Sequence, residues 1–121
     1  MIRGIRGAIT VKNNTKQDIL AATEELLEEM IAENDLVEEK MASIFFSLTS
    51  DLDAVFPAVA ARNIGYEQVA LFCSQELDIK DGLEKCIRVL IHYNTDIKQK
   101  DIKHIYLRQA KNLRPDLVGG E

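Results

Sequence analysis

The sequence predicts an α+β domain in which helices cover one face of a mixed five-stranded sheet. Two observations lead to this fold class: five short segments have the composition of strands, and one long segment has the apolar period of a helix. Along the chain, the order is strand, helix, strand, short helix and three strands. A chain of 121 residues with 46% apolar side chains suffices for one domain with a core. We expect this domain to span residues 1–117, with residues 118–121 as a flexible tail.

The first strand is predicted at residues 2–11, where side chains alternate between two faces. One face is mostly apolar and is expected to contact the core. Arg6 lies on the other face, between Gly4 and Ala8. Because Gly4 and Ala8 are small, we expect space above the sheet beside Arg6, which a ligand or another chain can fill.

A long helix is predicted at residues 16–33. Thr15 is a suitable N-cap, and Asp18 three residues later forms a variant of the capping box. The residues expected to face the core are Ile19, Thr23, Leu26, Leu27, Met30 and Ile31. The opposite face is acidic, and its like-charged pairs at i and i+4 indicate a solvated surface.

The rest of the chain predicts one short helix and four more strands. The helix is expected at residues 56–62, with Pro57 in its first turn and Gly65 beyond its end. In the last strand, Tyr106 alternates with apolar neighbours and is expected to face away from the core. The four strands are expected at residues 40–49, 69–75, 86–93 and 104–107.

Arg88 stands in the middle of the apolar strand at residues 86–93. A guanidinium removed from water costs several kcal/mol, and arginine does not escape this cost by losing its proton. We therefore expect an anion beside Arg88: a carboxylate of this chain, a carboxylate of a neighbouring chain, or a ligand. Arg88 and Arg6 are expected on the sheet face that the helices leave open. An open face of this kind predicts an oligomer.

Composition narrows the classes of partner and location. The net charge of −5 argues against nucleic acid. No apolar run approaches the roughly 20 residues that span a bilayer, and the first residues lack the apolar segment of a signal peptide. We therefore expect no membrane association and a cytoplasmic location. Cys73 and Cys86 lack metal-site spacing and are interpreted as free, buried thiols of a reducing compartment.

The sequence contains no metal-binding motif, phosphate-binding loop or nucleophile elbow. Only a few side chains therefore remain as candidates for a catalytic or binding role. His92 and His104 are isolated and are interpreted as hydrogen-bonded or surface histidines. The candidate residues are Arg6, Arg62, Arg88, Arg114, Glu76 and Tyr106. One interpretation is a salt bridge between Glu76 and Arg88 that links subunits. The other is a site for a ligand with two carboxylates and a hydroxyl group.

Six blocks, in order over nearly the whole chain, carry a resemblance to a known family. They are IRGIRGA (2–8), DLDAVFPA (51–58), CSQE (73–76), KCIRV (85–89), HIYL (104–107) and LRPDL (113–117). Together they resemble chorismate mutase of the small, monofunctional, homotrimeric α+β class, and not the all-helical class. Six matching blocks are a specific signal, whereas any one of them alone is weak.

This resemblance implies that the chain isomerises chorismate to prephenate by a [3,3] rearrangement in phenylalanine and tyrosine biosynthesis, without a cofactor. It also implies a homotrimer with a pseudo-barrel core and active sites between subunits. By resemblance, Arg88 stabilises the breaking ether oxygen and Glu76 accepts a hydrogen bond from the ring hydroxyl. Arg6 and Tyr106 bind the enolpyruvyl carboxylate. The other implied substrate-binding residues are Cys73, Phe56, Ala58, Arg62, Leu71, Phe72, Leu113 and Arg114.

The sequence departs from the family pattern at two positions near the implied site. Val59 stands where relatives often carry a lysine, and Phe72 stands where a smaller hydroxyl residue is familiar.

Two functions other than chorismate mutase are alternatives for this chain. Small trimeric enzymes that hydrolyse reactive imines also use an interfacial arginine, but the CSQE and LRPDL blocks argue against them. A non-enzymatic trimer that binds a metabolite or is purely structural would use the arginines only to pair with acids.

Overall fold

The computed structural model describes residues 1–113 and confirms the predicted α+β fold. Each predicted helix and strand is present, with ends within two residues of the expected positions. The strands are β1 (Ile2–Thr10), β2 (Met41–Leu48), β3 (Ala70–Gln75), β4 (Cys86–Asn94) and β5 (Ile105–Leu107). The helices are α1 (Lys16–Asn34) and α2 (Ala58–Asn63), with short 3-10 helices η1 (Glu38–Lys40), η2 (Gln99–Asp101) and η3 (Arg108–Leu113). The predicted tail and the predicted domain end at residue 117 lie outside the described residues.

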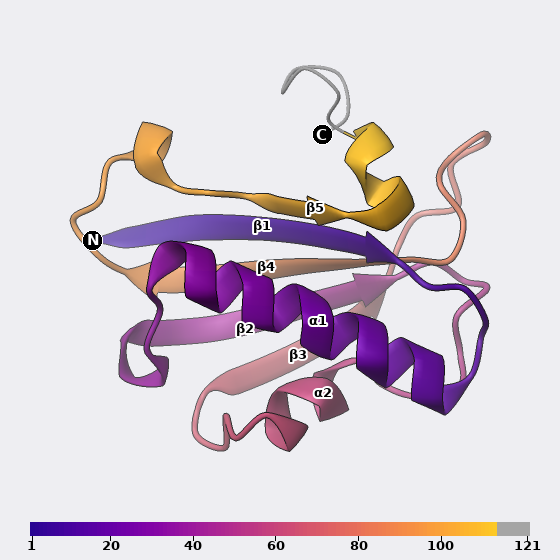
Figure 1. Ribbon diagram of the computed structural model, residues 1–121, viewed down its shortest axis with the longest axis horizontal. Coiled ribbons are helices and arrows are strands. Elements are labelled where there is room, and N and C mark those ends of the chain that lie inside the picture. The colour runs from indigo at the N-terminus through magenta and orange to yellow at the C-terminus, as the bar shows by residue number, and fades with distance from the viewer. Residues whose placement is uncertain (114–121) are drawn as a thin grey trace.

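The five strands form one mixed sheet in the order β3-β2-β4-β1-β5. The central strand β4 pairs antiparallel with β1 and β2, while β5 runs parallel to β1 and β3 runs parallel to β2. Figure 1 shows the strands side by side behind α1. Because β4 lies in the middle, the strand that carries Arg88 is paired on both sides.

Helix α1 packs along the sheet through the apolar stripe that its sequence predicts. The Thr15 hydroxyl accepts a hydrogen bond from the Asp18 N–H at 3.1 Å, so the predicted N-cap is confirmed. The helix approaches β1 closely at Gly7, where a Cβ would lie 2.4 Å from the Met30 sulfur. Ile31 is only partly buried. The fully buried residues of the stripe are Ile19, Ala22, Thr23, Leu26, Leu27 and Met30.

Helix α2 is short and starts at Ala58, two residues after the predicted start, so Pro57 is the N-cap and not part of the first turn. Pro57 has a φ of −62° and precedes the first helical residue. Gly65 follows the helix with a φ of 102°, a backbone conformation that glycine adopts without strain. Ala60 and Ala61 are buried, so α2 closes the edge of the core near β3.

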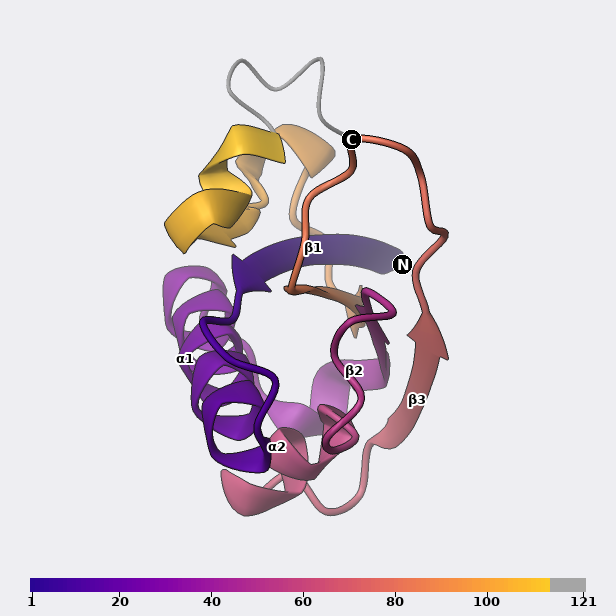
Figure 2. The same ribbon diagram turned by 90° about the vertical axis from the view of Figure 1, so that its right-hand side faces the viewer.

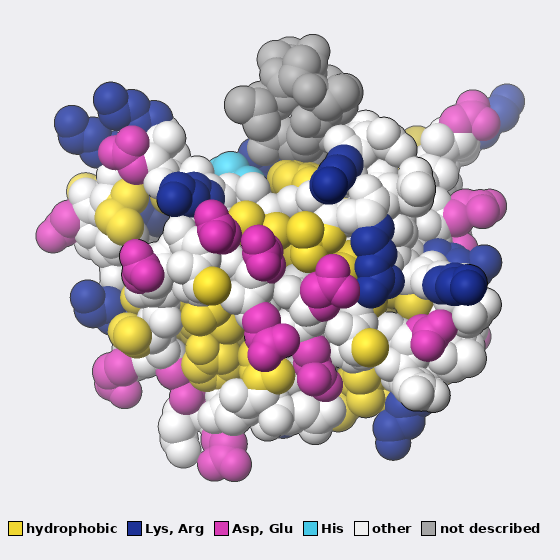
Figure 3. All heavy atoms as spheres, viewed as in Figure 1, with side chains coloured by type: hydrophobic (Ala, Val, Ile, Leu, Met, Phe, Trp, Pro, Cys, Tyr) yellow, Lys and Arg dark blue, Asp and Glu magenta, His cyan; other side chains and the backbone are white. Residues whose placement is uncertain are grey.

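The two faces of the sheet have different surroundings. In β4, Ile87, Val89 and Ile91 are buried in the core, whereas Arg88 and Leu90 alternate with them on the opposite face. Figure 2 shows α1 and α2 on one side of the curved sheet, and within residues 1–113 neither α-helix covers the other side. The acidic side chains of α1 lie over the helix-covered side (Figure 3). We call the side without α-helices the open face.

One end of the open face is covered by η3, which the sequence analysis did not predict. Ala8, Cys86 and Ala110 form a second buried cluster, against which Tyr106 and Leu113 pack. The space expected beside Arg6 is therefore filled by this chain itself on the side of Ala8 only, because a pocket lined by Arg6 remains on the open face. Residues 108–113 contain few apolar side chains, so their pattern does not distinguish a packed 3-10 turn from a loop.

The chain has no membrane-spanning candidate in the part that is described. None of the helices within residues 1–113 combines the length and the apolar character that a bilayer crossing requires.

Candidate active site

Strand pairing places five residues in one row across the open face. Ser47 of β2 lies opposite Ser74 of β3 on one side and opposite Arg88 of β4 on the other. Ala8 of β1 lies between Arg88 and Tyr106 of β5. Directly paired residues point to the same face of a sheet. Arg88 and Tyr106, which are far apart in sequence, therefore lie in one row on the same face of the sheet.

Arg88 has the carboxylate partner that its sequence context predicts. Its Nε lies 3.6 Å from Oε2 of Glu76, which follows the end of β3 in the same chain. The side chains are 32% and 26% exposed, so the pair is half-buried in the single chain. The interpretation in which this salt bridge joins two subunits was wrong, because β3 and β4, on either side of β2 in one sheet, bring the two residues together.

Ser47 is a site residue that the sequence analysis missed. Its hydroxyl donates a hydrogen bond to Oε2 of Glu76, the same oxygen that lies near Arg88. Ser47 shares its face of β2 with Ser43 and Phe45, between core residues such as Phe46. That alternation identifies its face, but only the register of β2 against β4 places it beside Arg88.

A second row, next to the first, brings Arg6 to the same pocket. Arg6 lies opposite Leu90, which lies opposite Phe45, and Phe45 lies opposite Phe72. The pocket between the two rows has a volume of about 320 Å³. Three predicted catalytic residues, Arg6, Glu76 and Arg88, line it. Its other lining residues are Gly7, Phe45, Phe46, Ser47, Ser74, Val89 and Leu90.

Tyr106 is close to this pocket but does not line it. It lies two strands from Arg88 in the same row, which corresponds to about 10 Å between Cα atoms. Its ring packs against the cluster of Ala8 and Cys86. Long arginine and tyrosine side chains bridge such a distance when a ligand lies between them.

The remaining predicted residues do not gather around Arg88 in the single chain. Leu71 and Cys73 have the opposite parity in β3 and lie on the helix-covered side, where both pack against the core. Cys73 shares a hollow of about 660 Å³ with Phe56, whose side chain is 70% exposed. Phe72 is on the open face, 60% exposed, with its ring centroid 5.7 Å from that of Phe45.

Three further predicted residues line neither pocket. Ala58 begins α2, and Arg62 of the same helix donates from Nη1 to the Tyr66 carbonyl oxygen at 2.7 Å. Leu113 packs at the end of η3. Arg114 lies outside the described residues.

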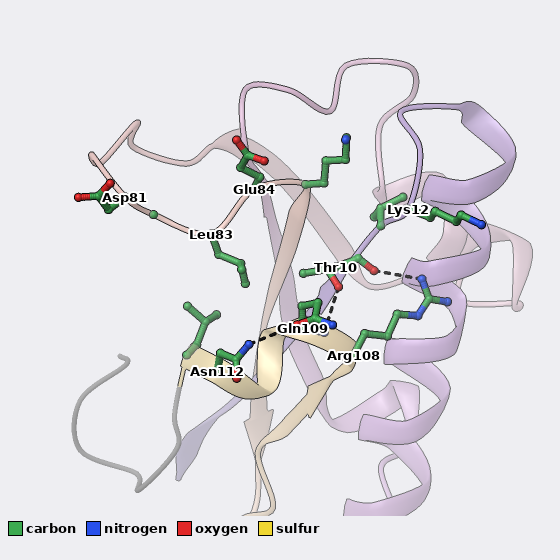
Figure 4. A pocket seen from close by; sticks show the side chains of 12 residues that line it. Thr10, Lys12, Asp81, Leu83, Glu84, Arg108, Gln109 and Asn112 are labelled. Atoms are coloured by element: carbon green, nitrogen blue, oxygen red, sulfur yellow. Dashed lines mark hydrogen bonds between the residues drawn. The ribbon is translucent and has the colours of Figure 1, made fainter.

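A larger hollow of about 770 Å³ is lined by residues 81–85, η3 and the end of β1. Figure 4 shows Leu83 on one side of this hollow and Gln109 and Asn112 on the other. The Arg108 guanidinium donates to the Thr10 carbonyl oxygen at 3.0 Å, and the Gln109 N–H donates to the Thr10 hydroxyl at 3.2 Å. Of the predicted site residues, only Leu113 lines this hollow.

Burial favours the protonated form of both thiols near the site, and both imidazoles are hydrogen-bonded. Burial raises the pKa of Cys86 to about 11, although the charge of Arg88 partly opposes this shift. Burial also raises the pKa of the Cys73 thiol. His104 Nδ1 accepts a hydrogen bond from the Arg6 N–H, and His92 Nδ1 is 2.9 Å from the Ser43 hydroxyl. Both histidines are hydrogen-bonded, as predicted.

Metal-ligating side chains do not cluster in this region. Within residues 1–113, no group of three or more His, Cys, Asp or Glu side chains is arranged to hold a metal ion. The geometry instead offers fixed cations, one carboxylate and hydroxyl groups on an open sheet face. Such a site suits a small polyanionic ligand.

Comparisons with known proteins agree with this geometry. The chain is 48% identical to chorismate mutase AroH of Bacillus subtilis (strain 168), over 97% of this chain and 93% of that protein. It is 47% identical to chorismate mutase AroH of Thermus thermophilus over the full length of both. A solved chorismate mutase from Clostridium thermocellum superposes with a TM-score of 0.89 and 54% identity, covering 91% of this chain and 98% of that structure.

The description of the matching family agrees with these relatives. Residues 2–117 match the sequence model of chorismate mutase type I. The match spans β1, which carries Arg6, as well as Glu76, β4 and β5. The chain therefore belongs to the type I chorismate mutases, isomerases that convert chorismate to prephenate.

Proposed function

We propose that the 320 Å³ pocket on the open face is where this chain binds chorismate and rearranges it to prephenate. The observation that carries the proposal is the pairing of Arg88 with Glu76 beside Arg6, all on one face of the sheet. Chorismate carries two carboxylates, a ring hydroxyl and the ether bond that breaks. The pocket therefore offers two cations, Arg6 and Arg88, for the enolpyruvyl carboxylate and the ether oxygen, and an acceptor for the hydroxyl.

Arg88 is the residue that we assign to the breaking bond. As the ether C–O bond lengthens, its oxygen gains negative charge. A guanidinium fixed in the central strand binds this oxygen more strongly in the transition state than in the substrate, which lowers the barrier. The ladder bonds of β4 on both sides support this role, because the cation needs no rearrangement when the charge develops.

Glu76, Arg6 and Tyr106 hold the folded substrate around Arg88. We assign Glu76 to accept the hydrogen bond of the ring hydroxyl and to offset positive charge on the ring. Arg6 and Tyr106 bind the enolpyruvyl carboxylate from the neighbouring row and strand. These contacts fold the enolpyruvyl arm over the ring and pre-organise the reacting carbons, so the rearrangement is intramolecular positioning plus electrostatic stabilisation.

We also propose that three chains assemble through their open faces into a homotrimer with a pseudo-barrel core. Support comes from Phe72 and Phe45, whose tilted rings lie side by side and exposed on the open face, although large exposed aromatic rings are unfavourable in a monomer. The hollow of Phe56 and Cys73 would then face the Arg88 pocket of the adjacent chain and complete the site. We assign Ala58 and Leu71 to the same apolar wall, with Val59 beside it, whereas Phe72 meets the adjacent chain from the open face.

The remaining residues are proposed to act on approach and closure. Arg62, which is exposed on α2, attracts the dianion, and Arg114 with Leu113 closes the site from the end of the chain. We propose a cytoplasmic location, which the unpaired Cys73 and Cys86 favour because both thiols are free of disulfides.

The loss of chorismate absorbance in the presence of purified protein tests the proposed site. Arg88→Ala should reduce kcat by about a hundredfold or more, since one preorganised charge is removed. Glu76→Gln should lose less, because glutamine keeps an acceptor oxygen. Arg3→Ala is the matched control: Arg3 lies in β1 near Arg6, but its Nε donates to the Ile97 carbonyl oxygen. Equal losses in Arg88→Ala and Arg3→Ala would place the reaction elsewhere.

A further inference from the structure

We infer that Ser47 is a positioning residue that orients the Glu76 carboxylate for the rearrangement. The inference rests on the proposed role of Glu76 in substrate binding. Ser47 belongs to none of the six sequence blocks that carry the family resemblance. It acts through Glu76 and is not assigned any contact with the reacting atoms.

Glu76 needs such an anchor because it stands where the sheet ends. Its N–H donates to the Leu48 carbonyl oxygen at 2.9 Å, one residue beyond β3. The following residues form a long loop, and its apolar members Leu77 and Ile79 are largely exposed. The sheet therefore holds the backbone on the N-terminal side of Glu76, but no strand continues on its C-terminal side.

Ser47 supplies the second fixed point. It lies in β2 and pairs with strands on both sides, opposite Ser74 and Arg88. Its hydroxyl donates to Oε2 of Glu76, and the Arg88 Nε lies 3.6 Å from the same oxygen. Two groups that belong to rigid strands thus define where Oε2 lies. We assign the other oxygen, Oε1, to accept the hydrogen bond from the ring hydroxyl of the substrate.

The hydroxyl of Ser47 also limits how closely Glu76 pairs with Arg88. A glutamate without this bond is able to rotate and present both oxygens to the guanidinium, the geometry that arginine–carboxylate pairs prefer. A fully paired Arg88 would offer less positive potential to the breaking ether oxygen. Loss of the serine hydroxyl should therefore affect the transition state more than substrate binding.

Four variants measured by chorismate consumption test the inference. Ser47→Ala should lower kcat on the order of tenfold with a smaller change in KM, the size expected for one hydrogen bond to a charged group. Ser47→Thr keeps a hydroxyl and should restore most of kcat. Ser43→Ala is the matched control, since Ser43 lies on the same face of β2 but bonds His92. The fourth variant combines Ser47→Ala with Glu76→Ala and is compared with Glu76→Ala alone.

The double variant separates this inference from the proposed function. If Ser47 acts through Glu76, adding Ser47→Ala to Glu76→Ala should cost little further kcat, because alanine leaves no acceptor for the hydroxyl to orient. Full additivity, an unchanged kcat in Ser47→Ala, or failure of Ser47→Thr to rescue would overturn the positioning role while leaving Glu76 in place. A Glu76→Gln protein with unchanged kcat would overturn the proposed role of Glu76 and the inference together. Circular dichroism of each variant verifies that the fold is retained.

Discussion

At the scale of single residues, one face of strand β4 packs in the core and the other face carries the charged site residue Arg88. Ile87 and Val89 of β4 belong to the core, while Arg88 between them faces the open side and meets Glu76. In one chain, this arginine remains about one-third exposed, so its desolvation is moderate until a ligand or another chain covers it. Its partner is already in place, because an unpaired cation there would be costly.

Cys86, beside Arg88, makes stability depend on pH in the alkaline range. Its pKa is raised from 9.0 to about 11 by burial. Between these values the unfolded chain releases the thiol proton and the folded chain keeps it, so stability falls as pH rises. This contribution is on the order of 2 kcal/mol. Urea unfolding from about pH 8 to about pH 10.5 should show a steeper fall for the wild type than for Cys86→Ala. Parallel curves would contradict a buried, neutral thiol.

At the scale of elements, the start of α1 depends on one side-chain hydrogen bond. Thr15 caps the helix through the Asp18 N–H. Thr15→Ala should lower the free energy of unfolding by about 1 kcal/mol, whereas Thr15→Ser keeps the cap and should change little. Urea midpoints at one fixed protein concentration measure both. The same loss in both variants would show that the hydroxyl is not the stabilising group.

The elements also show how far the sequence determines this structure. Alternation and capping were enough for β1, α1 and β4, because each pattern is local and Thr15 marks the start of α1. The pairing of Glu76 with Arg88 was identified as an option, but its placement within one chain depends on the register of three strands. Ser47 and η3 were missed for the same reason. The role of a serine in a strand, or of a polar turn, depends on the residues that pack beside it, and the local sequence does not show them.

At the scale of the whole molecule, the predicted site residues fall on two sides of the edge strand β3. Arg6, Glu76 and Arg88 line one pocket, while Phe56 and Cys73 line another. A second chain is the simplest way to bring the two groups together. The family assignment favours chorismate mutase activity over imine hydrolysis and over a purely structural role.

Light scattering tests that assembly directly. The wild-type protein should have three times the mass of one chain. Phe45→Glu, which places a charge on the open face, should weaken the trimer and reduce activity at low protein concentration. Val37→Glu is the matched control, because Val37 is also an exposed apolar residue but lies before η1. A fully active monomer would contradict a site shared between chains.

The central claim is that the positive charge of Arg88 stabilises the transition state. Replacement of Arg88 by citrulline, which has nearly the same shape but no charge, isolates that charge from the size of the side chain. The account predicts that kcat falls by about a hundredfold to a thousandfold with little change in KM. A rise in KM with kcat unchanged would contradict it, since Arg88 would then serve substrate binding alone.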